Sequence, residues 1–310
     1  MKVGLCLPQL GDGITVDVVR GFAQRAEALG YASLWVQDHF LWPLEPRRGY
    51  GGRNGAPIPP QYQSVLAPLP LLTAAATWTS TVRLGTSVLV AGNHRPVPLA
   101  QQLATIDVLS NGRLTVGLGV GWSAEEHDAC GTDITTRGER IDDFVATLRA
   151  CWADDPVEHD GPYFSVPPSM MRPKPVQRPH PPLISGMWSE AGLDRTRRLF
   201  DGWNPAGQSV ERTHATITRL NSDRPAGMAP LTMHHRAFAQ FPFAPTPPDD
   251  VVERLASEAA EAAAAGFEEM VLEHNFWSGV ADPAAWGDVP DRFLPVLRAA
   301  TAAVAAPDVP

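Results

Sequence analysis

Short apolar runs alternate with amphipathic helical segments along almost the whole chain, and this alternation restricts the fold more than any other feature. A strand pattern over residues 3–7 is followed by helical spacing of apolar residues over 16–29, with a stop at Gly30. A second strand pattern covers Ser33–Val36. Repeated strand-then-helix order predicts a parallel sheet, and a count of about eight units predicts closure into a (β/α)8 TIM barrel.

The same order continues to the end of the chain. Further strands are predicted at residues 82–90, 114–119, 183–186, 201–203, 231–240 and 269–273. Further helices are predicted at residues 66–77, 98–109, 137–152, 190–200, 210–221, 248–265 and 290–303. The sequence contains no stretch with the composition of an inter-domain linker, so we expect residues 1–310 to form a single α/β domain.

Proline-rich segments interrupt this order. Residues 43–60 are too long for a simple strand-to-helix turn, so we expect them to form an insertion loop that covers the barrel or walls a substrate pocket. The stretch 241–248 is expected to shape the same pocket. Residues 160–162 predict a hairpin turn, and residues 167–182 predict a crossing loop.

The balance of charges restricts the partners. The chain has 34 acidic and 25 basic residues and a formal net charge of −9. Nucleic acids and anionic membranes both bind through clustered Lys and Arg, so the composition argues against each. The sequence lacks a membrane span and a signal-peptide pattern. We therefore expect a cytoplasmic protein that acts on a small molecule.

Asp38 and His39 come directly after the second strand, where barrels place their catalytic groups. An imidazole titrates near neutrality, so His39 could give or take a proton, while Asp38 could orient it or bind a cofactor. Taken alone, the pair fits a structural role better, with Asp38 as a cap and His39 packed in the loop. Trp42 could stack on a ring or pack at the rim.

A glycine-rich strand end, Gly117-Leu118-Gly119-Val120-Gly121, is the second candidate. Alternating glycines let the backbone approach a ligand and expose N–H groups to a phosphate, although a barrel corner that needs small residues explains them equally well. The spacing is not the dinucleotide-binding fingerprint. Ser185-Gly186-Met187 after a later strand is a weaker signal of the same kind.

Metal and serine-nucleophile chemistries are not supported. Adjacent His234 and His235 point to opposite faces of a strand, so at most one faces the barrel interior. The sequence contains no His-x-His or His-x3-His pair and no Gly-x-Ser-x-Gly motif. We expect no metal site.

Taken together, several blocks resemble the bacterial luciferase-like superfamily of flavin and deazaflavin oxidoreductases. The resemblance is strong over residues 1–205 and looser beyond. It rests on the order and spacing of the segments GYASLWVQDHF, VRLGTSVLVAGNHRPVPLAQQLATIDVL, SNGRLTVGLGVGW, PPLISG and DGW. DHF with the following Trp42, and GTSVL, are most similar to the branch that uses coenzyme F420, an 8-hydroxy-5-deazaflavin.

The resemblance implies which residues form the cofactor site. Asp38 and His39 would lie beside the deazaflavin ring, and a bulge or a non-prolyl cis peptide at Ser87-Val88 would support it. Gly119, Val120 and Gly121 would run along the cofactor, and Gly186 and Met187 would contact its phosphate. The candidate residues are therefore His39 and Asp38 for catalysis; Asp38, Ser87, Val88, Gly119, Val120, Gly121, Trp122, Gly186 and Met187 for the cofactor; and Trp42 and Trp122 for the substrate.

Two positions depart from the pattern. Sugar-phosphate dehydrogenases of this branch carry a catalytic Glu where this chain has Trp122, which favours an apolar or aromatic substrate wall and leaves His39 as the expected titrating group. The phosphate turn often has two glycines, whereas Gly186 is followed by Met187.

The leading hypothesis is an F420-dependent oxidoreductase that transfers a hydride between the deazaflavin C5 and a small organic substrate, with His39 handling the proton. An FMN-dependent luciferase-like monooxygenase, supplied by a separate reductase, is the alternative on the same fold. A third is a non-catalytic flavin-binding protein. The resemblance also implies a homodimer.

Overall fold

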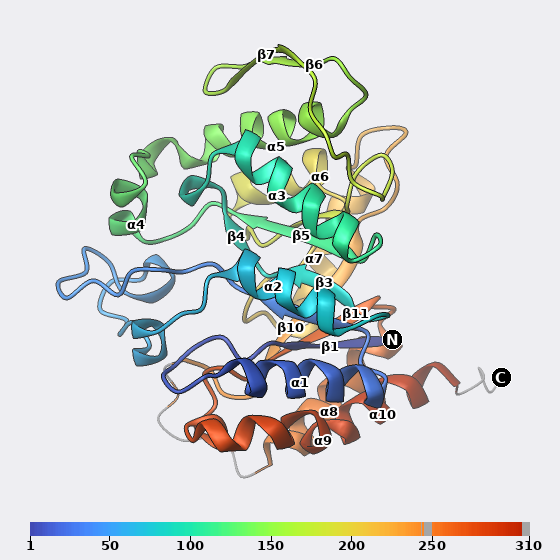
Figure 1. The fold of residues 1–310 in the computed structure, drawn as a ribbon. Helices are drawn as coiled ribbons and strands as arrows, with labels where there is room; N and C mark the ends of the chain where they lie inside the picture. Colours follow the sequence, from blue (N-terminus) through green and yellow to red (C-terminus); the bar gives the residue numbers. More distant parts are fainter. Residues whose placement is uncertain (243, 245–249, 306–310) are drawn as a thin grey trace.

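Eight parallel strands close into a barrel in the computed structural model of the chain (Figure 1). The structure describes residues 1–242, 244 and 250–305, with the backbone alone for 303–305. The strand order is β3-β2-β1-β11-β10-β9-β8-β5, and pairing of β3 with β5 closes the barrel. The barrel strands are β1 (Lys2–Cys6), β2 (Ser33–Val36), β3 (Arg83–Thr86), β5 (Leu114–Gly119), β8 (Leu183–Ser185), β9 (Gly202–Trp203), β10 (Thr232–Phe238) and β11 (Glu269–Glu273). The predicted (β/α)8 barrel is confirmed.

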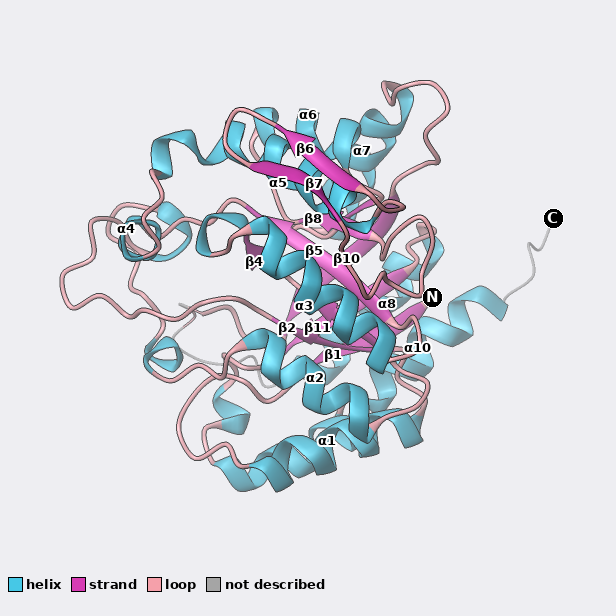
Figure 2. Ribbon diagram, turned by 45° about the horizontal axis from the view of Figure 1, so that its top comes forward, coloured by secondary structure: helices cyan, strands magenta, loops and turns pink. Residues whose placement is uncertain are grey.

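Helices surround the strands, as Figure 2 shows in cyan and magenta. They are α1 (Val16–Leu29), α2 (Pro68–Trp78), α3 (Pro96–Leu109), α4 (Ala124–Ala129), α5 (Arg137–Trp152), α6 (Glu190–Leu199), α7 (Val210–Ser222), α8 (Val251–Ala264), α9 (Val289–Arg292) and α10 (Leu294–Ala305). The bounds of α1 agree with those predicted from helical spacing and the stop at Gly30. The Thr15 side chain caps its first turn, and Gly30 ends it with φ of 89°, in the left-handed region that glycine tolerates.

A two-stranded hairpin, β6 (Val157–Asp160) with β7 (Ser165–Ser169), lies outside the barrel at the top of Figure 1. The predicted turn at residues 160–162 is confirmed, whereas the predicted crossing loop begins inside β7. Buried Asp143 of α5 anchors the hairpin by accepting hydrogen bonds of 2.8 Å from the backbone N–H groups of Tyr163 and Phe164. The hairpin is therefore tied to the helix layer.

The predicted strand at residues 82–90 is interrupted. It consists of β3 and β4 (Leu89–Val90), separated by Ser87 and Val88, and the Ser87-Val88 peptide bond is cis. The cis peptide that the family resemblance implied at this position is confirmed. After the interruption, β4 pairs again with β5, where Val90 lies opposite Gly119.

Glycines at the ends of two neighbouring strands make room for the Val88 side chain: Gly119 ends β5, and Gly186 directly follows β8. A Cβ atom at Gly119 would lie 2.7 Å from Val88 Cγ2, and one at Gly186 would lie 2.8 Å from Val88 Cγ1. Carbon atoms in contact need about 3.5–4 Å, so no larger residue fits at either position without movement. These two glycines are needed for packing at the interruption.

Trp35 fills the centre of the barrel. It packs with Cys6, Ile184 and Val271, and a Cβ atom at Gly85 would lie 2.2 Å from the Trp35 ring. Nearer the amino-terminal end, the Trp35 indole N–H donates to Ser33 Oγ at 2.6 Å, and Ser33 in turn donates to buried Glu269. The barrel interior is therefore closed at this end, which leaves the carboxyl end for ligands.

The carboxyl ends of the strands point to the left in Figure 1, where residues 40–67 and α4 project from the barrel. Two turns of 3-10 helix, Tyr50–Gly52 and Pro60–Gln63, stiffen the long loop. Five of the residues at 241–248 lie outside the described part, so the expected role of that stretch stays a prediction. Within the described ranges, no helix is long and apolar enough to cross a membrane.

Candidate active site

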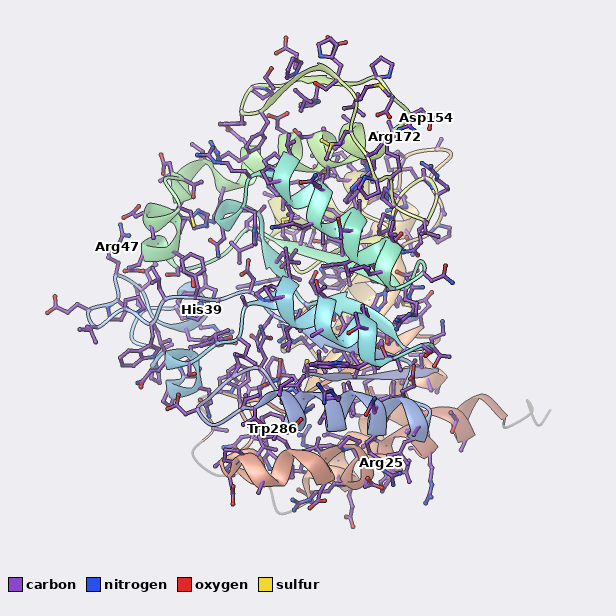
Figure 3. All side chains as sticks on the ribbon, in the orientation of Figure 1. Arg25, His39, Arg47, Asp154, Arg172 and Trp286 are labelled. Atoms are coloured by element: carbon purple, nitrogen blue, oxygen red, sulfur yellow. The ribbon has the colours of Figure 1, made fainter. Side chains whose placement is uncertain are left out.

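His39 lies at the carboxyl end of the barrel, on the same side as Arg47 of the long loop (Figure 3). Its Nδ1 atom is 2.8 Å from Oε1 of Glu126, and the two side chains are only 3% and 4% exposed. Helix α4 carries Glu126, and the Ser123 hydroxyl caps this helix by accepting from the Glu126 backbone N–H. A short capped helix thus sets a carboxylate against the imidazole at the end of β2.

Glu126 is held as a carboxylate. Burial alone would raise the pKa of Glu126. The hydrogen bond and electrostatic attraction of His39, with the hydrogen bonds from the backbone N–H groups of Phe40 and Leu41, outweigh burial, so the pKa of Glu126 is lowered. A carboxylate only accepts hydrogen bonds, so the proton between the two residues belongs to Nδ1 of His39. In the tautomer with the hydrogen on Nδ1, the lone pair lies on the other ring nitrogen, Nε2.

The Nε2 atom of His39 is buried and has no hydrogen-bond partner among the described residues. The imidazole centroid lies 4.2 Å from the ring of Tyr62 and 5.6 Å from that of Trp122, which is nearly parallel to it at 19°. A buried polar atom without a partner is unusual in a native protein and calls for an explanation such as a catalytic role or a bound water or ion. The Nε2 atom is therefore a candidate contact for a bound molecule.

Asp38 does not pair with its neighbour. Its Oδ2 atom accepts from the backbone N–H of Val90 at 3.0 Å and lies 2.8 Å from Nε2 of His94. The interpretation in which Asp38 orients His39 is therefore wrong, because Glu126 has that position. Asp38 instead fastens the end of β2 to β4, and its own backbone N–H donates to the carbonyl of Val88 at 3.2 Å.

Two buried side chains hold Ser87. Arg236 of β10 donates to the Ser87 carbonyl at 2.6 Å, and Asn204 donates to the Ser87 hydroxyl at 3.1 Å. Arg236 also pairs with buried Glu273. Burial disfavours both charged groups, but the attraction between them is stronger. This attraction raises the pKa of Arg236 and lowers the pKa of Glu273. The Ser87-Val88 segment is therefore hydrogen-bonded to Arg236 and Asn204 in the barrel interior, as well as to Asp38.

Apolar and aromatic side chains cover these polar groups. We call them the mouth cluster, which consists of Leu10, Trp42, Tyr50, Ile58, Tyr62, Val65, Trp122, Phe238, Phe241 and Phe276. Tyr62 donates to Oε1 of Gln37 at 2.8 Å, and burial raises the pKa of its phenol. The indole N–H of Trp42 is buried and meets no acceptor within the described part of the chain. Any molecule at His39 is surrounded by rings.

The glycine turn after β5 is shaped by His127. Its Nε2 atom is 3.0 Å from the carbonyl of Val120, and burial lowers the pKa of this imidazole. Gly121 has φ of 75°, and a Cβ atom there would lie 2.5 Å from Val90 Cγ1. The turn therefore needs glycine for its conformation and its packing, and it delivers Trp122 to the mouth cluster.

At the other predicted turn, the backbone N–H groups serve the protein itself. That of Gly186 donates to the Leu118 carbonyl at 3.0 Å, and that of Met187 donates to Ser185 Oγ at 3.1 Å. The Met187 side chain is buried. A cofactor phosphate cannot take these two donors without replacing existing bonds, and phosphate binding at Gly186 and Met187 stays a prediction.

The described residues contain no group of three or more His, Cys, Asp or Glu side chains arranged to hold a metal ion. His234 lies inside the barrel, 3.4 Å from Glu269, whereas His235 points outward and lies 2.7 Å from Glu258 of α8. The prediction that the two histidines face opposite sides of the strand is confirmed.

Sequence comparison identifies the family. A family model described as luciferase-like monooxygenase matches residues 1–275. The chain belongs to this family. Its relatives include an uncharacterized protein of Mycobacterium tuberculosis, 32% identical over 212 residues, which are 68% of this chain and 74% of that protein. The luciferase-like fold and an oxidoreductase-type enzyme, both implied by the resemblance, are confirmed.

Two further similar proteins have a cofactor in their names. An FMNH(2)-dependent dimethylsulfone monooxygenase of Pseudomonas putida is 30% identical over 210 residues, or 67% of this chain and 53% of that enzyme. An F420-dependent secondary alcohol dehydrogenase, solved with an F420-acetone adduct, superposes with a TM-score of 0.72 at 17% identity, covering 96% of this chain and 98% of that one. The structural likeness shows a shared fold alone.

In this luciferase-like chain, the structure divides the predicted residues into two groups. His39, Trp42 and Trp122 meet in or beside the mouth cluster. Asp38, Ser87, Val88, Gly119 and Gly186 instead build the interruption between β3 and β4. The sequence reasoning missed the side chains that hold both groups in place, namely Gln37, Tyr62, Glu126, Asn204, Arg236 and Glu273. Of these, only Glu126 had a readable signal, the Ser-x-x-Glu capping pattern that begins at Ser123.

Proposed function

We propose that the chain is an F420-dependent oxidoreductase that transfers a hydride between the deazaflavin C5 and a small organic substrate. The observation that carries the proposal is the Nε2 atom of His39, which lacks a hydrogen-bond partner among the described residues. Its imidazole lies beside the rings of Tyr62 and Trp122 and is held by the Glu126 carboxylate. Reduction of a carbonyl, imine or activated alkene requires one proton in addition to a hydride. A carboxylate-supported imidazole supplies or removes such a proton at neutral pH.

The residues around Ser87 fit a planar redox ring. When bound, the deazaflavin supplies the hydride chemistry, and the protein need only bind and orient it. In our proposal Asp38, Ser87, Val88 and the Gly119–Trp122 turn hold the cofactor. Asp38, Arg236 and Asn204 already fasten the Ser87-Val88 backbone rigidly, as a support for a ring requires.

His39 acts at the substrate end of the site. With Nδ1–H fixed on Glu126, its Nε2 takes the proton of an alcohol in the oxidative direction and returns it to the oxygen in the reductive direction. The buried indole N–H of Trp42, which lacks an acceptor among the residues described, can donate to the same class of oxygen. Rings of the mouth cluster exclude water and favour an apolar substrate.

An FMN-dependent monooxygenase is the second candidate. The 30% identity with the FMNH(2)-dependent dimethylsulfone monooxygenase favours it, although the chain spans only 53% of that enzyme. A reduced flavin reacts with oxygen, whereas a deazaflavin does so poorly. The choice between the two therefore depends on which cofactor the protein binds.

Titration of the purified protein with each cofactor tests the proposal. We expect F420 fluorescence to be quenched on binding, with FMN binding weakly or not at all. Tight binding of FMN, with no response to F420, would overturn the F420 assignment in favour of the second candidate.

A further inference from the structure

Two side chains that bond Ser87 each carry a further buried polar atom without a hydrogen-bond partner among the described residues. These atoms are the Nε–H group of Arg236 and the Oδ1 atom of Asn204. Asn204 is 2% exposed and Arg236 is 9% exposed. Leaving such groups unsatisfied is costly, so a native site usually provides a partner for each.

The two atoms belong to one location. Arg236 bonds the Ser87 carbonyl and Asn204 bonds the Ser87 hydroxyl, so both side chains converge on a single residue. Residue 206, two positions after Asn204, also pairs with Arg236 through a parallel bridge. The two terminal nitrogens of Arg236 and the amide nitrogen of Asn204 each have a partner, so the atoms without one are a donor, Arg236 Nε, and an acceptor, Asn204 Oδ1.

This location adjoins the mouth. The Arg236 guanidinium lies 5.4 Å from the ring centroid of Phe238, a member of the mouth cluster. Ser87 itself belongs to the backbone interruption that supports the cofactor in our proposal. The donor and acceptor therefore belong to side chains in contact with the residues to which the proposed function assigns the redox ring.

We propose that Arg236 Nε–H and Asn204 Oδ1 bind the imide edge of a flavin-type ring. That edge presents an N–H at N3 between two carbonyl oxygens. The N3–H would donate to Asn204 Oδ1, and an adjacent carbonyl would accept from Arg236 Nε. This inference rests on the proposal that a deazaflavin or flavin binds, but F420 and FMN share the edge, so it does not depend on which of them is used.

A cofactor methylated at N3 tests the assignment directly. The wild type should bind the 3-methyl derivative of whichever cofactor it takes roughly tenfold more weakly than the parent, because a hydrogen bond is lost and the methyl group meets Asn204. In Asn204→Ala the parent should bind more weakly, and the methyl group should no longer matter. A purely structural role for Asn204 would not remove this sensitivity to methylation.

Arg236→Lys tests the proposed hydrogen bond from Arg236 Nε to a cofactor carbonyl. Lysine keeps a positive charge for Glu273 but has no Nε–H donor. We expect the parent cofactor to bind roughly five- to tenfold more weakly than to the wild type. Gln101→Ala, which removes an exposed amide from the outer face of α3, is the matched control and should bind like the wild type. Melting curves verify that each variant is folded.

Equal affinity of the wild type for parent and 3-methyl cofactor would overturn the inference, since water would then satisfy the two groups. So would an undiminished effect of methylation in Asn204→Ala. Failure of the wild type to bind either F420 or FMN would contradict the proposed function itself, a result that is distinguishable from both.

Discussion

The Nδ1 atom of His39 lies 2.8 Å from Oε1 of Glu126, although the two residues are 87 positions apart in the chain. Both side chains are almost completely buried, and Glu126 also accepts from two backbone N–H groups of the loop after β2. The carboxylate therefore fixes the tautomer and the orientation of the imidazole. This geometry leaves Nε2 as the ring nitrogen without a partner among the described residues, the atom to which our proposal gives the substrate.

Replacing Glu126 by Gln tests this relationship. The amide keeps the shape but removes the negative charge that accepts from Nδ1 of His39, so we expect kcat to fall about 100-fold. Glu125→Gln alters the neighbouring, more exposed carboxylate, which pairs with Arg47, and should leave kcat unchanged. Wild-type kcat in Glu126→Gln would mean that Glu126 only packs.

Asp38→Asn should separate positioning from proton transfer. Asp38 holds the Val90 N–H and His94 and does not contact Nε2 of His39. We expect the dissociation constant of the cofactor to rise roughly tenfold, because the backbone around Ser87-Val88 loses an anchor, with the pH profile of kcat preserved. A displaced pH profile with unchanged cofactor affinity would instead make Asp38 part of the acid–base machinery.

Gly119→Ala should clash with Val88, since the added Cβ would meet Val88 Cγ2 at 2.7 Å. Overpacking of this kind costs about 1–3 kcal/mol of unfolding free energy. The double variant with Val88→Ala should recover part of the loss, which urea denaturation can measure. Gly21→Ala, where open space surrounds the new atom on α1, is the control and should not destabilise the protein. Additive losses in the double variant would contradict the packing described here.

His274 predicts how stability depends on pH. Burial among Phe22, Trp286 and Phe293 lowers the pKa of His274 to about 4, whereas the unfolded chain has an ordinary imidazole with a pKa of about 6.5. The unfolded state therefore binds more protons between these values. Stability from the neutral ring is present above pH 6.5 and is lost as the pH falls towards 4, by about 3 kcal/mol in total.

His274→Phe should remove this part of the pH dependence. Urea midpoints at pH 7 and pH 4.5 give the comparison, and His214→Phe, at an exposed histidine of α7, is the control. The loss of stability on acidification should be smaller in His274→Phe than in the wild type or in the control. An equal loss in all three proteins would show that other groups govern acid sensitivity.

The periodicity of apolar residues predicts most of the fold. The bounds predicted for α1, β2, β5, α5 and β11 agree with those observed because each element has either regular helical spacing or a bounded apolar run. The run at residues 82–90 looked continuous because its β-branched residues favour a strand throughout. Its interruption depends on room provided by Gly119, at the end of β5, and Gly186, directly after β8, and strand periodicity cannot show such a spatial relationship.

The candidate site was predictable only in part. His39 and Trp122 could be placed because each directly follows a strand end, which in a barrel is the ligand side. The six residues of α4 are too few to show helical spacing, so Glu126 was missed, and the sequence analysis names His39 alone as the titrating group. Arg236 and Asn204 were missed because alternation along a strand predicts a face and not a contact.

The most direct test of the account is His39→Ala, assayed for both F420 affinity and turnover on a panel of ketones, imines, activated alkenes and secondary alcohols. If His39 handles the proton without holding the cofactor, kcat should fall at least about 100-fold while the dissociation constant of F420 stays within about threefold of the wild type. Unchanged turnover in His39→Ala would contradict the account and leave His39 as a packing residue.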